Sequence, residues 1–87
     1  MATKVITTTV NAKAVIPTPI YNHVTFTVKI PAAEVNGLRI YDADSTNTDF
    51  FSMDPGDNIA ITITNGEQFF WEGDGGACNV ELIGQGW

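Results

Sequence analysis

The sequence has little of the chemistry that many catalytic sites need. It contains one cysteine, Cys78, and one histidine, His23, among 87 residues. A lone cysteine cannot form an intrachain disulfide, and within a strand it is most often a small buried apolar side chain. A thiol nucleophile also needs a nearby base, and the alternation around His23 turns that side chain toward solvent. We therefore expect a structural cysteine, an exposed histidine and no enzymatic activity.

Basic residues are also scarce. Four lysines and arginines face ten acids, and the net charge of −6 disfavours nucleic-acid binding, which needs a basic face. Residues 1–33 hold three lysines and no acid, whereas residues 34–87 hold all ten acids and one arginine, giving +3 and −9. This asymmetry predicts that the leading segment docks on acidic surface, either its own or a neighbour's.

Long apolar runs are missing as well. No stretch of about 18 apolar residues exists, so we expect no membrane-spanning helix and no membrane partner. Threonines interrupt the first ten residues, which argues against a secretion signal and predicts synthesis in the cytoplasm. A chain of this length forms one domain that hides roughly 60–65% of its unfolded surface. It therefore needs an efficient core or help from oligomerisation.

The clearest pattern that is present is the alternation between residues 58 and 64. Ile59, Ile61 and Ile63 recur at every second position, as in a strand with one buried face. The Asn-Gly pair that follows is the strongest short turn signal known from sequence. We therefore predict a hairpin over Asn58 to Glu72 at the centre of the fold.

The register of this hairpin follows from its apolar residues. A two-residue turn would place an isoleucine opposite a glutamate, whereas a three-residue loop pairs Ile61 with Phe69 and Ile59 with Trp71. The longer loop keeps the apolar side chains on one face. It leaves Phe70 on the opposite face, where another segment covers it or a partner contacts it.

Other short apolar stretches alternate in the same way between turn signals. We predict further strands at Thr3–Val10, Ala14–Ile16, Tyr21–Ile30, Leu38–Asp42, Phe50–Met53 and Cys78–Ile83. Turns are expected at residues 54–57 and 73–76, which are rich in Asp, Pro and Gly. About seven short strands without a helix predict an all-β fold, a small antiparallel β-sandwich or barrel.

The first 19 residues differ from the rest. Their β-branched residues end at Pro17 and Pro19, which indicates an extended N-terminal arm or an edge strand beside a single-domain body of residues 20–87. Trp87 follows a flexible Gly-Gln-Gly, so it either folds back over the open end of the sandwich or anchors in a neighbouring subunit. The predicted partner interface comprises Lys4, Val5, Ile6, Val10, Lys13, Val15, Phe70 and Trp87.

A polar loop is the one candidate for a metal site. Asp42, Asp44 and Asp49 supply the oxygen side chains that Ca²⁺ prefers. The glycine and the glutamate that an EF-hand loop needs are absent, since Asn47 and Met53 stand at those positions. The alternative is a solvated loop whose side chains cap its own turns, and we otherwise expect no cofactor.

Aromatic residues leave a second functional class open. β-sandwich modules that bind carbohydrate stack sugars on exposed aromatics, for which Tyr21, Tyr41, Phe70, Trp71 and Trp87 are available. Against this, the predicted register turns Trp71 inward, and secretion is not indicated. A small carbohydrate- or calcium-binding β-sandwich module is therefore the alternative function.

Several features occur together: a short, acidic, β-rich chain, a basic leading segment stopped by prolines, and an aromatic tail. In this general character the chain resembles small accessory virion proteins of tailed bacteriophages, such as capsid decoration proteins. The resemblance implies a β-rich body outside the shell, often a trimer, with Ala2 to Ile16 pairing with capsid protein. The expected function is a non-enzymatic structural protein of the virion that binds and stabilises a larger assembly.

Overall fold

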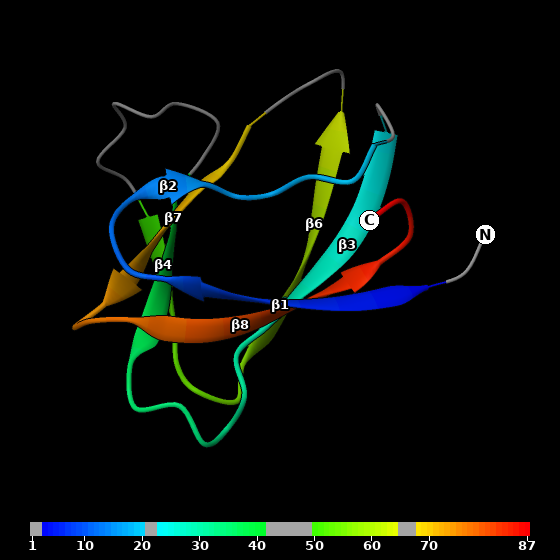
Figure 1. The fold of residues 1–87 in the computed structure, drawn as a ribbon. Helices are drawn as coiled ribbons and strands as arrows, with labels where there is room; N and C mark the ends of the chain where they lie inside the picture. The colour runs from blue at the N-terminus through cyan, green and yellow to red at the C-terminus, as the bar shows by residue number, and fades with distance from the viewer. Residues whose placement is uncertain (1–2, 21–22, 42–49, 65–67) are drawn as a thin grey trace.

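The protein forms two antiparallel β-sheets that pack face to face (Figure 1). The computed structural model describes residues 3–20, 23–41, 50–64 and 68–87. Within these ranges there is no helix, and the predicted all-β fold is confirmed as a sandwich. The strands are β1 (Lys4–Val10), β2 (Ala14–Val15), β3 (His23–Lys29), β4 (Gly37–Tyr41), β5 (Phe50–Met53), β6 (Asn58–Thr64), β7 (Phe70–Asp74) and β8 (Cys78–Gly84).

The chain passes repeatedly from one sheet to the other. One sheet has the order β1-β8-β3-β6 and the other the order β2-β7-β4-β5, with every neighbouring pair antiparallel. Among these strands, each connection except that from β4 to β5 crosses between the sheets. Strands β1 and β2 are therefore the edges on one side of the sandwich, and β5 and β6 are the edges on the other.

The core lies between the sheets and is built from the inward positions of the alternating strands. On β3, Phe26 and Val28 are at most 1% exposed, and Val24 is half-buried. The alternation in β6 and β8 is confirmed in the same way. The buried cluster comprises Val10, Ile16, Phe26, Val28, Ile30, Leu38, Ile40, Met53, Ile61, Ile63, Trp71, Cys78, Val80 and Leu82.

The predicted central hairpin is wrong. Strand β6 pairs along its whole length with β3, and β7 pairs with β4 and β2 in the opposite sheet. Ile61 and Trp71 both point inward as predicted, but they face the core from different sheets. Phe70 lies opposite Tyr41 of β4. The alternation identified the buried faces. It does not determine whether two strands with buried faces lie side by side in one sheet or face each other across the core.

The leading segment is part of the folded body. All seven residues of β1 pair with β8, and β2 pairs with β7. Val10 is 2% exposed and Ile16 is 0% exposed, so both lie in the core. The N–H of Ile16 donates to the carbonyl oxygen of Phe69 at 2.8 Å, which extends the pairing beyond β2. Of the two interpretations of this segment, an extended arm or an edge strand, its described part contains the edge strands β1 and β2.

Candidate functional site: an apolar cleft between two edge strands

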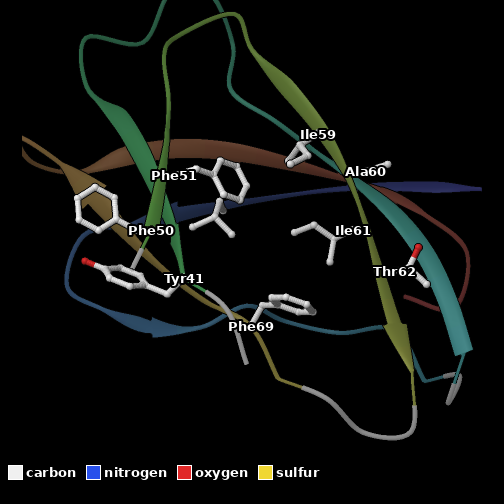
Figure 2. A pocket seen from close by; sticks show the side chains of 9 residues that line it. Tyr41, Phe50, Phe51, Ile59, Ala60, Ile61, Thr62 and Phe69 are labelled. Carbon is white, nitrogen blue, oxygen red and sulfur yellow. The ribbon is translucent and has the colours of Figure 1, made fainter. Parts of the chain in front are cut away.

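The sandwich is open on the side of β5 and β6. The turn at residues 54–57 joins these strands at one end, where the N–H of Asp57 donates to the carbonyl oxygen of Asp54 at 3.0 Å. Beyond this turn a cleft of about 430 Å³ lies between the two sheets (Figure 2). Its lining residues are Ile40, Tyr41, Phe50, Phe51, Ile59, Ala60, Ile61, Thr62 and Phe69.

Phe51 shows most directly that the core is incomplete here. It pairs with the buried Ile40, so its side chain points toward the interior. It is nevertheless 44% exposed, whereas Met53, the next inward residue on the same strand, is 4% exposed. The ring therefore stands at the mouth of the cleft (Figure 2), and no described side chain covers its exposed part.

Phe50 extends the apolar surface around the edge of the sheet. It pairs with Tyr41 and points to the outer face, where it is 46% exposed. The ring centroids of Phe50 and Tyr41 lie 5.4 Å apart, and the guanidinium carbon of Arg39 lies 4.9 Å from the Phe50 centroid. Of the adjacent phenylalanines on β5, Phe51 therefore faces the interior, whereas Phe50 borders the cleft at the edge of the sheet and packs against Tyr41 on the outer face.

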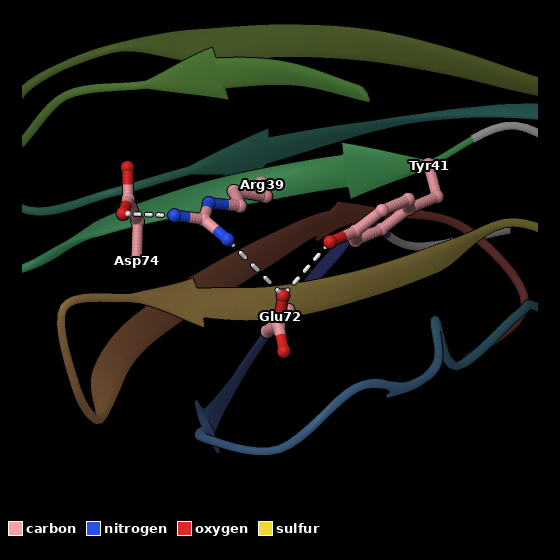
Figure 3. Close-up of polar contacts among 4 residues, drawn as sticks. All are labelled: Arg39, Tyr41, Glu72 and Asp74. Carbon is pink, nitrogen blue, oxygen red and sulfur yellow. Dashed lines mark hydrogen bonds and ion pairs between the residues drawn. The ribbon is translucent and has the colours of Figure 1, made fainter. Parts of the chain in front are cut away.

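A polar network holds this outer face together (Figure 3). Arg39 contacts Asp74 Oδ1 at 3.1 Å and Glu72 Oε1 at 3.6 Å, and all three side chains are about one-third exposed. The Tyr41 hydroxyl donates to Glu72 Oε1 at 2.8 Å. Lys13 Nζ lies 4.0 Å from the Tyr41 ring centroid, which ties the connection between β1 and β2 to the same surface.

Within this network Tyr41 is a neutral hydrogen-bond donor. The hydrogen bond to Glu72, followed by burial, raises the pKa of Tyr41 above its ordinary value of 10.0. The pKa of Arg39 is also raised, first by its hydrogen bond with Tyr41 and then by Asp74. Neither group is thereby prepared to lose a proton near neutral pH, so the network positions strands β4 and β7 rather than activating a nucleophile.

The lining of the cleft suits an apolar occupant. Among its lining residues only Tyr41 and Thr62 have polar side-chain atoms, and their hydroxyls are bonded to Glu72 and to Thr25. Apolar clefts of several hundred Å³ accommodate bulky apolar groups of a ligand or of a partner protein. A hydrated sugar would find few hydrogen-bonding groups here.

The described residues offer no alternative site of another kind. Among them, no group of three His, Cys, Asp or Glu side chains could hold a metal ion. The candidate calcium ligands Asp42, Asp44 and Asp49 lie outside the described residues. Cys78 is fully buried, and burial raises the pKa of its thiol. None of the described residues belongs to a helix that could cross a membrane.

The residues predicted to contact a partner are distributed over several surfaces. Lys4 and Val5 are exposed on β1, and Ile6 on the same strand is half-buried. Lys13 is exposed, but its ammonium group lies over Tyr41. Val10 lies in the core and cannot contact a partner.

The structure brings two of the predicted residues together on one face. Val15 is opposite Phe70, which is opposite Tyr41, which in turn is opposite Phe50. These side chains form a row across all the strands of the sheet β2-β7-β4-β5. Sequence reasoning missed Phe50 and Phe51, although adjacent phenylalanines in a strand must face opposite sides.

Trp87 folds back onto its own chain. Its ring meets that of Phe26 edge-on, with the centroids 5.3 Å apart at an interplanar angle of 82°. The carbonyl oxygen of Gly86 accepts a hydrogen bond from the N–H of Ile20 at 3.1 Å, which fixes the tail. Of the two alternatives, folding back onto the sandwich or anchoring in a neighbouring subunit, the structure of one chain shows Trp87 folded back.

No protein-family model, curated protein or solved structure matches this chain.

Proposed function

We propose that this chain is a non-enzymatic structural protein that binds a larger protein assembly through the cleft between β5 and β6. The observation that supports this most is the exposure of Phe51 and Phe50, at 44% and 46%, beside an apolar cleft. Full burial of a phenylalanine contributes roughly 1.5–3 kcal/mol. Covering the exposed halves of both rings would therefore contribute about 1.5–3 kcal/mol to binding.

In this proposal the occupant of the cleft comes from another molecule. Segments 42–49 and 65–67, which precede β5 and follow β6 in the sequence and lie outside the described residues, contain no apolar side chain larger than alanine. They cannot supply the bulky group that the cleft would accommodate. An apolar side chain of a partner protein fits both the size and the lining of the cleft.

The edge beside the cleft favours a partner in strand conformation. β6 is seven residues long and contains no charged residue, proline or glycine. Natural edge strands usually carry such residues because they prevent unwanted pairing. A long, uncharged edge next to an apolar cleft is suited to β-strand addition, in which backbone hydrogen bonds give affinity and a side-chain pocket gives specificity.

The assembly that we propose is the virion of a tailed bacteriophage, in which the chain would act as a capsid decoration or accessory protein. The support for this step is the resemblance in size, charge asymmetry and β-rich composition, together with a surface suited to protein contact. Carbohydrate binding is less well supported, because the walls of the cleft are apolar and the hydroxyls of Tyr41 and Thr62 are already bonded to Glu72 and Thr25.

Sedimentation of material from the native source tests the proposal. Tagged wild-type chain should travel with a particle much larger than its own 9.4 kDa, and the Phe51→Lys variant should remain with free protein. Val35→Lys is the matched control, because Val35 is an apolar residue that is 92% exposed in the connection between β3 and β4. If Phe51→Lys, shown to be folded by circular dichroism, travels with the particle as the wild type does, the cleft is not the contact surface.

A further inference from the structure

The two lateral sides of the sandwich carry most of its exposed apolar residues. Among the described residues, six large hydrophobic side chains are exposed, and four of them lie on edge strands. Val5 on β1 is 56% exposed and Val15 on β2 is 41% exposed, whereas Phe50 and Phe51 lie on β5. Apolar surface is therefore available on both sides, not on one alone.

The charged residues at the two sets of edge strands differ in sign. Lys4 lies on β1 and Lys13 lies between β1 and β2, and neither of these strands contains an acid. The turn between β5 and β6 carries exposed Asp54 and Asp57, and neither β5 nor β6 contains a lysine or arginine. Opposite charges favour contact between unlike sides and disfavour contact of the acidic side with itself.

The strand directions also match. Each sheet has four strands, and every strand is antiparallel to the next one in the order β1-β8-β3-β6 or β2-β7-β4-β5. The two edges of each sheet therefore run in opposite directions. A second copy placed alongside in the same orientation presents its β1 antiparallel to β6 and its β2 antiparallel to β5.

The lengths and faces of these edges are compatible as well. β1 and β6 each contain seven residues, and both alternate between core-facing and outward positions. Among the described residues, β1 pairs with β8 alone and β6 with β3 alone, so the outer edge of each is open. The outer row that ends at Phe50 would continue into Val15 of the next copy.

We infer that the cleft between β5 and β6 binds a second copy of this chain, which adds its β1 and β2 edge. This inference rests on the proposed function of the cleft and identifies the neighbour that occupies it within the larger assembly as another copy of this chain. The contact is head-to-tail, so each copy uses two different sides and the assembly grows into a closed ring or a filament. A closed ring would leave no sheet edge open.

Measurement of mass in solution by light scattering tests the inference. The wild type should have a mass of at least twice 9.4 kDa, and this mass should fall as salt is raised, because opposite charges contribute to the contact. Phe51→Lys, altered on one side, and the double variant Lys4→Glu/Val15→Glu, altered on the other, should each be monomeric. An equimolar mixture of the two should form a heterodimer of twice the chain mass, because each retains one intact side.

Controls separate this inference from its alternatives. Val35→Lys should assemble as the wild type does. If Lys4→Glu/Val15→Glu keeps the wild-type mass while Phe51→Lys is monomeric, the contact is two-fold symmetric and the head-to-tail inference is wrong. If the wild type is monomeric up to roughly 1 mM, the inference is also wrong. A loss of particle binding by Phe51→Lys would in that case still support the proposed function.

Discussion

Replacing Ile16 with alanine tests whether the leading segment belongs to the folded body. The side chain is 0% exposed, and its backbone N–H is bonded to Phe69, so the substitution removes buried apolar atoms and leaves the hydrogen bond intact. Such a truncation in a core costs about 2–5 kcal/mol. In a domain of this size each kcal/mol lowers the Tm by roughly 4–8 °C, so we expect the Tm to fall by at least about 8 °C.

Ile20→Ala is the matched control for this experiment. It is the same substitution four residues later, at a side chain that is 79% exposed. We expect a change in the free energy of unfolding within about 0.5 kcal/mol. Urea unfolding, followed by the fluorescence of the two tryptophans, compares the variants directly. Equal midpoints for the two variants would show that Ile16 is not part of the core and would refute the placement of the leading segment in the folded body.

Two further predictions concern the outer network and one glycine. Glu72→Gln should bring the Tyr41 pKa back toward 10.0, measured by ultraviolet titration with the other tyrosine replaced by phenylalanine; an unchanged pKa would contradict the role of Glu72. Because the folded-state pKa is raised, the stability from this bond is full below about pH 10 and is lost as the pH rises through the folded value. Gly73→Ala should cost roughly 1–3 kcal/mol in urea unfolding, because its Cβ would lie 2.9 Å from the backbone oxygen of Val10 and closer still to that of Gly76. A wild-type midpoint would show that the backbone can move there.

The sequence predicts which faces are buried because burial has a simple period in a strand. The positions expected to face inward on β3, including Phe26 and Val28, are buried, and so are Cys78, Val80 and Leu82 on β8. Phe26, Val28 and Val80 each lie between two polar neighbours, so the choice of face is determined locally. The all-β class follows from the same local signals.

The pairing of the strands is not a local property. Ile61 and Trp71 are buried whether their strands lie side by side or face each other across the core, so the alternation fits both arrangements. An Asn-Gly turn signal favours a tight reversal, but it does not determine which sheet the next strand joins. Here β6 finds a partner of equal length in β3, and β7 lies between β2 and β4.

The position of the candidate site depends on this same difference. If β6 had paired with β7, it would not be an edge strand, and its isoleucines would lie beside the aromatic residues of one sheet. With β7 in the opposite sheet, β6 and β5 both end their sheets on one side, and the cleft lies between them. One signal for this was present in the sequence. Phe50 and Phe51 are adjacent in a strand, so one of them must leave the interior, and an edge strand beside an open cleft is where both can be partly exposed.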